Sequence, residues 1–171
     1  MLANKNNIAP SLQALEDAPK ATYEFVIIEE NAAERKTLDK MKLSQKAYVE
    51  YGKIENNFSL LRQIIETIDS RPISKDSKLD WLQSRVWDFV TSDPKLFTKL
   101  ATDPLLPTKA LIGDAVEAGV ISKRGNYYYY KKDNTPLCES NEEPTLNVAA
   151  KYLNAPKHQE LLLTIQAQVK D

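Results

Sequence analysis

The sequence has a single cysteine, Cys138, and a single histidine, His158. One cysteine cannot form a disulfide within the chain, which fits a reducing compartment. A zinc site built from cysteine and histidine clusters is also excluded, and a serine–histidine–aspartate triad would depend on His158 alone. Neither cysteine nor serine lies beside His158 in the sequence. We therefore assign no catalytic residue and expect a protein that is not an enzyme.

Glycine is also scarce, with four residues that are not clustered. This excludes a phosphate-binding loop and a dinucleotide fingerprint, so we expect no cofactor. Mean hydropathy is −0.47 and no long apolar run is present, so we expect no membrane partner. The first residues, MLANKNNIAPS, lack the apolar region of a secretory signal. Net charge is −1, so any DNA contact would need a local basic patch.

What remains is the composition of an ordinary globular protein: 171 residues, 42% hydrophobic and 27% charged. The pattern predicts an α+β fold that is mostly α. We expect an arm and a strand at residues 1–31 and a long helix or helical hairpin at 32–69. A polar linker at 70–77 then leads to a winged-helix-like C-terminal domain with a small β-hairpin at 78–171.

Residues 21–30, ATYEFVIIEE, are rich in aromatic and β-branched side chains and predict a strand. No hairpin partner follows it, and an unpaired strand edge tends to bind another strand. The strand would therefore pair with a distant segment or with another chain, which makes Tyr23, Phe25 and Ile27 interface candidates. The alternatives are an apolar segment packed on the core and the start of the next helix.

Residues 47–68 carry apolar side chains at alternating spacings of four and three, which is typical of a coiled-coil seam: Ala47, Tyr51, Ile54, Phe58, Leu61, Ile65 and Ile68. Leu38 and Met41 do not continue this row. A seam of this length is typical of an amphipathic helix packed on its own domain. The alternative is a helix that packs against copies of itself, with Tyr51, Ile54, Phe58 and Leu61 at the interface.

The C-terminal part predicts the order helix, short helix, helix, hairpin, which is the order of a winged helix. Asp93–Pro94 and Thr108 are start signals for the second and third helices, and Gly119 can end the third. Gly125–Asn126 predicts a tight turn before the strand Tyr127–Tyr130. The expected elements are helices at 78–91, 94–101, 109–118, 144–153 and 157–169, a short strand that begins at Val120 and Ile121, a strand at 127–130, and a possible third strand at 135–138.

Residues 109–132 contain five basic and two acidic side chains, for a net charge of +3. In winged helices the wing contacts phosphates while the preceding helix enters the major groove. Here the helix is a poor reader of bases, because its expected outward residues are Gly113, Asp114 and Glu117. The alternative is a basic face that only contacts solvent. The candidate DNA contacts are Lys109, Lys123, Arg124, Lys131 and Lys132.

The four consecutive tyrosines should alternate between the two faces of a strand. Either Tyr127 and Tyr129 or Tyr128 and Tyr130 would then be exposed, for a protein interface or for stacking on bases. We favour the interface and assign it to Tyr128 and Tyr130. The acidic residues Glu139, Glu142 and Glu143 lack the spacing of a metal loop, so we expect no metal; acids there favour the start of the following helix.

The segments Tyr127–Tyr130, Thr135–Leu137 and Leu153–Lys157 carry a resemblance. Around them, residues 131–170 resemble the C-terminal part of proteins encoded by tailed bacteriophages. The resemblance implies a protein of the virion or of the packaging apparatus, located in the virion or the host cytoplasm. It implies no catalytic residue.

Together these patterns predict a non-enzymatic assembly protein of a tailed phage. Its partners would be further copies of itself or neighbouring assembly proteins, with double-stranded DNA contacted through the hairpin. The alternative prediction is a winged-helix DNA-binding protein, such as a transcriptional regulator or the DNA-recognition subunit of a packaging machine.

Overall fold

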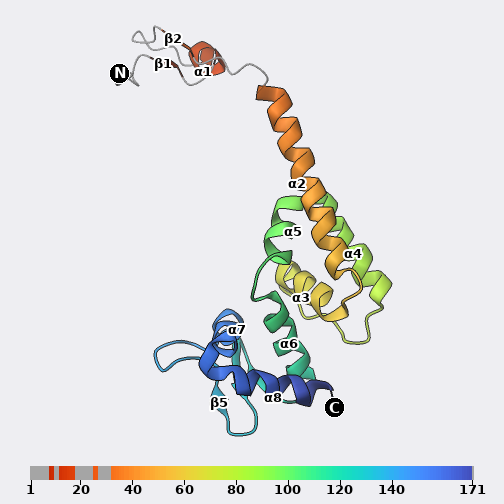
Figure 1. The fold of residues 1–171 in the computed structure, drawn as a ribbon, viewed down its shortest axis with the longest axis vertical. Helices are drawn as coiled ribbons and strands as arrows, with labels where there is room; N and C mark the ends of the chain where they lie inside the picture. Colours follow the sequence, from red (N-terminus) through yellow and green to blue (C-terminus); the bar gives the residue numbers. More distant parts are fainter. Residues whose placement is uncertain (1–7, 10–11, 18–24, 27–31, 171) are drawn as a thin grey trace. The chain divides into compact units, whose positions relative to one another are not determined.

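A computed structural model describes residues 8–9, 12–17, 25–26 and 32–170. Contacts divide the chain into two units, residues 1–42 and 43–171. The fold is α+β and mostly helical, with a small three-stranded antiparallel sheet, as the sequence predicts (Figure 1). The winged-helix likeness and the division into four predicted segments stay predictions. No described helix is both long and apolar enough to cross a membrane.

The first unit contains β1 (Ile8–Ala9), α1 (Leu12–Asp17) and β2 (Phe25–Val26). β1 and β2 pair in parallel, with Ile8 opposite Phe25. The strand predicted at 21–30 thus has a partner, and it is the preceding arm of the same chain. In the described residues this strand covers Phe25–Val26 only; Tyr23 and Ile27 lie outside them.

The segment 32–69 forms two helices, α2 (Ala32–Ile54) and α3 (Phe58–Asp69), and not one. The break follows from local chemistry, because Asn57 caps α3 by accepting a hydrogen bond from the Leu60 amide at 3.1 Å. α3 ends at Ser70, whose φ of 53° is left-handed. The segment thus consists of two helices joined at residues 55–57.

The predicted seam packs within the chain. Ala47, Ile54, Leu61 and Ile65 are buried in one core with side chains from the next two helices, α4 (Leu79–Ser92) and α5 (Pro94–Ala101). The side chains contributed by these helices are Leu82, Val86, Val90 and Phe97. α5 begins where predicted, because the Asp93 carboxylate accepts the Leu96 amide at 2.9 Å and Pro94 occupies the first turn.

The next helix, α6 (Leu106–Glu117), begins before the predicted residue 109. The Asp103 carboxylate accepts the Leu105 amide at 2.9 Å, and Pro107 is tolerated in the first turn because its missing N–H would be unpaired there. At the other end, Gly119 has a φ of 73°, as its predicted role requires. The Val120 amide donates to the Ala115 carbonyl at 2.9 Å, which completes a Schellman cap.

The sheet has the order β3 (Ile121–Arg124), β4 (Tyr127–Tyr130) and β5 (Thr135–Pro136). β5 is shorter than the predicted third strand. A 3₁₀ turn (Pro156–His158) separates α7 (Leu146–Asn154) from α8 (Gln159–Lys170), so the last two helices start later than predicted. Figure 1 shows β5, α7 and α8 together beside α6. They enclose a second core with Ile112, Ile121, Leu137, Leu153 and Ile165.

Candidate interaction surfaces

The expected recognition helix, α6, is enclosed by its neighbours. It packs against α3, α7, α8 and β3. Between Leu106 and Glu117, only Pro107 and Glu117 are exposed, and the other side chains are buried or half-buried. The expected outward position is confirmed for Glu117, whereas Gly113 and Asp114 are half-buried because this side of α6 lies against α3. A helix covered in this way cannot lie in the major groove of DNA.

The contact between α3 and α6 is built on a buried arginine. Arg62 on α3 places Nη1 2.8 Å from Glu117 and Nη2 3.4 Å from Asp114, both on α6. Its Nε lies 3.8 Å from Glu66 on its own helix. A Cβ on Gly113 would stand 3.1 Å from Arg62 Nη2, so the missing side chain makes room for the guanidinium. The acidic face of α6 is thus neutralised from within the chain.

The five predicted DNA contacts fall into two groups. Lys109 is 15% exposed and its Nζ lies 2.7 Å from Asp103 Oδ2, so its charge is already paired. The other four side chains are exposed and make no ion pair with a described residue: Lys123, Arg124, Lys131 and Lys132. Arg124 donates to Asn134 Oδ1 at 2.6 Å and lies over the Tyr129 ring at 4.9 Å. The acidic side chain of Glu139, which follows β5 in the sequence, pairs with Lys157 and not with any of these four.

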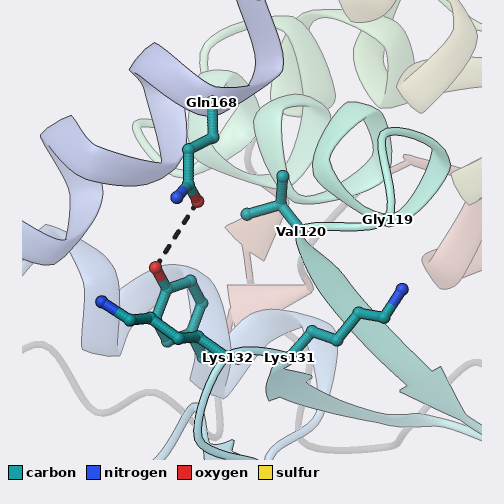
Figure 2. Close-up of a pocket in the computed structure, with 6 residues that line it drawn as sticks. Gly119, Val120, Lys131, Lys132 and Gln168 are labelled. Atoms are coloured by element: carbon teal, nitrogen blue, oxygen red, sulfur yellow. Dashed lines mark hydrogen bonds between the residues drawn. The ribbon is translucent and has the colours of Figure 1, made fainter.

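A pocket of about 390 Å³ lies at the base of the hairpin (Figure 2). The Tyr130 hydroxyl donates to Gln168 Oε1 at 3.5 Å across it. Figure 2 shows Lys131 and Lys132 extending to opposite sides, with Lys131 toward Gly119 at the end of α6. A cation there is favoured by the helix dipole. The two ammonium groups do not converge on one point, so the pocket does not hold an anion between them.

The four tyrosines alternate as predicted, but the outward-facing pair is Tyr127 and Tyr129. Tyr128 and Tyr130 are buried in the core, so their assignment to an interface is wrong. Tyr130 pairs with the buried Ile121 across β3 and β4, which fixes the inward face of the strand. Tyr127 and Tyr129 occupy the outer face and are half-buried.

The only cysteine and histidine lie near Glu139. Glu139 pairs with Lys157 at 2.7 Å and with His158 Nε2 at 3.5 Å, and the Lys157 hydrogen bond holds the pKa of Glu139 below its usual value. His158 also stacks on Tyr152, with ring centroids 3.7 Å apart. Burial raises the pKa of the Cys138 thiol. Among the residues that the structure describes, no group of three or more histidine, cysteine, aspartate or glutamate side chains could hold a metal ion.

Two exposed apolar surfaces were not assigned from the sequence. Every side chain from residue 33 to residue 42 of α2 is exposed, including Leu38 at 49% and Met41 at 55%. We call residues 33–42 the exposed α2 segment. The second surface is aromatic: Tyr48 stacks on Trp87 of α4 with ring centroids 5.4 Å apart. The signal for the first surface was present, since Leu38 and Met41 fall outside the seam that forms the core.

The predicted interface residues of the seam divide between core and surface. Ile54 and Leu61 are buried within the chain, so their side chains are not on the surface. Tyr51 and Phe58 are half-buried, and Tyr51 packs edge-on against Trp87 at 5.2 Å.

Comparison of the chain with protein-family models, with curated proteins and with solved structures finds no match.

Proposed function

We propose that this chain is a non-enzymatic assembly protein that associates with further copies of itself through the exposed α2 segment. One observation carries the proposal: residues 33–42 form three helical turns in which every side chain is exposed. Leu38 and Met41 are separated by three positions and therefore share a face of the helix.

The exposed α2 segment should bind a partner because a helical segment without packing is only marginally stable. Isolated helical turns are marginal in water, because most helix stability in proteins comes from packing an apolar face. Burial of apolar surface contributes about 25 cal/mol per Å². A partner that covers Leu38 and Met41 would supply this free energy and hold the segment helical.

The aromatic surface supports the same proposal. Tyr48 and Trp87 expose flat rings beside each other, and Trp81 on the same helix as Trp87 is 48% exposed. Tyrosine and tryptophan are enriched at protein interfaces. Two separate apolar surfaces suit a subunit that contacts more than one neighbour.

The setting of this assembly is proposed from the resemblance of residues 131–170 to tailed-phage proteins. A virion or packaging component, located in the virion or the host cytoplasm, would need self-association and no catalysis. The state of the two most reactive side chains supports a non-enzymatic role. Burial favours the protonated Cys138 thiol, which is the poorer nucleophile, and His158 is engaged by Glu139 and Tyr152.

The test is the mass of the protein in solution as a function of concentration. Light scattering should show that the wild type is an oligomer that dissociates on dilution. Leu38→Glu with Met41→Glu should shift the dissociation midpoint at least tenfold upward. Lys36→Gln with Lys40→Gln changes the opposite side of the same turns and should leave the midpoint unchanged. A wild-type monomer at all concentrations would overturn the proposal.

A second candidate function is non-specific contact with duplex DNA through the hairpin. It is favoured by Lys123, Arg124, Lys131 and Lys132, which are exposed without an ion pair to a described residue. Because α6 is enclosed, such contact would reach phosphates and not base edges. This contact is compatible with assembly and is tested independently of it.

A further inference from the structure

We infer that the exposed α2 segment is covered by α1 of a second copy of the chain. This inference rests on the proposed self-association and names the element that makes the contact. α1 has six residues, which is too short for a helix to be stable on its own. Its Leu12 and Leu15 are three positions apart, and Leu12 is 52% exposed. In the described residues, Leu12 of α1 and both Leu38 and Met41 of the exposed α2 segment are thus exposed, and Leu15 is half-buried.

Charge makes the two segments complementary. α1 ends in Glu16 and Asp17 and has no basic residue in its last turn. Carboxylates at the C-terminal end of a helix oppose its dipole, so these two acids need a cation from another element. The exposed α2 segment has four basic and two acidic side chains, for a net charge of +2.

The lining of the groove on the exposed α2 segment determines in which direction α1 can bind. Its volume is about 320 Å³, and its lining includes the small Ala33 and Thr37 beside Leu38 and Met41. Glu34 lines the same groove near the start of the helix. An acidic end placed there would be repelled, whereas the other direction places it beside Lys42. We therefore align α1 in parallel, with Leu12 on Leu38, Leu15 on Met41 and the acids beside Lys42.

A charge-reversal experiment tests the ion pairs. Glu16→Lys with Asp17→Lys should raise the dissociation midpoint of the oligomer at least tenfold. These changes improve the dipole interaction of α1 itself, so a loss of association would not come from a weaker helix. Adding Lys42→Glu should bring the midpoint back to within about threefold of the wild type, since tenfold corresponds to about 1.4 kcal/mol.

A cysteine cross-link tests whether the contact is between chains. In a Cys138→Ala background, copies carrying Leu15→Cys are mixed under mild oxidation with copies carrying Met41→Cys. The mixed pair should form a covalent dimer, whereas Lys36→Cys in place of Met41→Cys should not. A single chain with both Leu15→Cys and Met41→Cys that closes on itself at high dilution, without mixed dimers, would overturn the inference.

The outcomes separate the inference from the proposed function. A wild type that stays monomeric overturns both. A wild type that associates, with a midpoint unaffected by Glu16→Lys and Asp17→Lys and no mixed cross-link, overturns the inference alone.

Discussion

Arg62 is the charged side chain on which the joint between α3 and α6 depends. Its side chain is 5% exposed and lies within 4 Å of Glu66, Asp114 and Glu117. Desolvating these charges has a cost that their mutual attraction offsets only while all partners are present. Removing the guanidinium leaves three carboxylates close together, each without its main cation.

We expect Arg62→Ala to lower the free energy of unfolding by about 3–5 kcal/mol, because it breaks a buried ionic cluster. The measurement is equilibrium denaturation in urea. Arg85→Ala is the matched control, since Arg85 is 42% exposed and pairs with Asp69 at 3.2 Å. An exposed pair contributes about 0–1 kcal/mol. A loss for Arg62→Ala as small as the one expected for Arg85→Ala would show that the Arg62 cluster does not stabilise the fold.

The Asp103 carboxyl should make the stability of the protein depend on pH in the acidic range. Burial alone would raise the pKa of Asp103, but the hydrogen bonds from Lys109 and the Leu105 amide hold it below its usual value. A carboxyl whose pKa is lower in the folded state stabilises the protein above its unfolded pKa of about 3.9. This stabilisation is lost as the pH falls through the folded pKa.

Asp103→Asn should therefore lower stability by about 0.5–1 kcal/mol at pH 7, and the difference from wild type should shrink as the pH falls from about 3.9 through the folded pKa. Asparagine keeps an oxygen that can accept the Leu105 amide, so the change isolates the charge. Urea denaturation across this pH range measures both values. A difference that persists unchanged at low pH would mean that the lost contribution is not electrostatic.

At the scale of elements, local signals predicted local structure. The start of α5 was predictable, because Asp93 and Pro94 act on the backbone beside them. The reversal at Gly125 was predictable for the same reason. The sequence could not predict whether Tyr127 or Tyr128 faces outward. Alternation along the strand separates the tyrosines into two pairs, and the packing of the sheet on α6 and α7 decides which pair is buried. The Arg62–Asp114 pair joins residues 52 positions apart, which no local pattern reveals.

The same substitution, glycine to alanine, should have opposite effects on stability at Gly52 of α2 and at Gly113 of α6. Nothing lies within 4 Å of a Cβ built on Gly52, so Gly52→Ala should stabilise the protein by about 0.5–1 kcal/mol through helix propensity. A Cβ on Gly113 would meet Arg62 Nη2 at 3.1 Å.

Gly113→Ala should therefore lose this gain and destabilise the protein, because three carboxylates hold Arg62 in place. The two variants are compared by thermal and urea unfolding. A stabilisation of equal size at both positions would show that the guanidinium moves aside at no cost.

At the scale of the whole molecule, two kinds of surface lie on different elements. Exposed aromatic side chains lie on α2 and α4, which enclose the first core. The basic side chains without an ion pair to a described residue include Lys123 and Arg124 on β3, at the second core. Apolar rings suit a protein partner, whereas exposed ammonium and guanidinium groups suit phosphates. The net charge of −1 means that phosphate contact must come from a local basic patch, such as that of the hairpin.

Duplex binding should therefore be weak, independent of sequence and steeply dependent on salt. Each phosphate contact contributes about −0.9 to the slope of log K against log salt, so Lys123, Arg124, Lys131 and Lys132 should give a slope of about −3.6. Fluorescence anisotropy with unrelated duplexes between low and moderate salt measures this slope. Each single change to alanine should reduce it by about 0.9. Lys109→Ala should leave it unchanged, because Lys109 is paired with Asp103. If wild-type protein does not bind duplex even at low salt, the hairpin has no role on DNA, and its basic side chains serve only solvation or a protein neighbour.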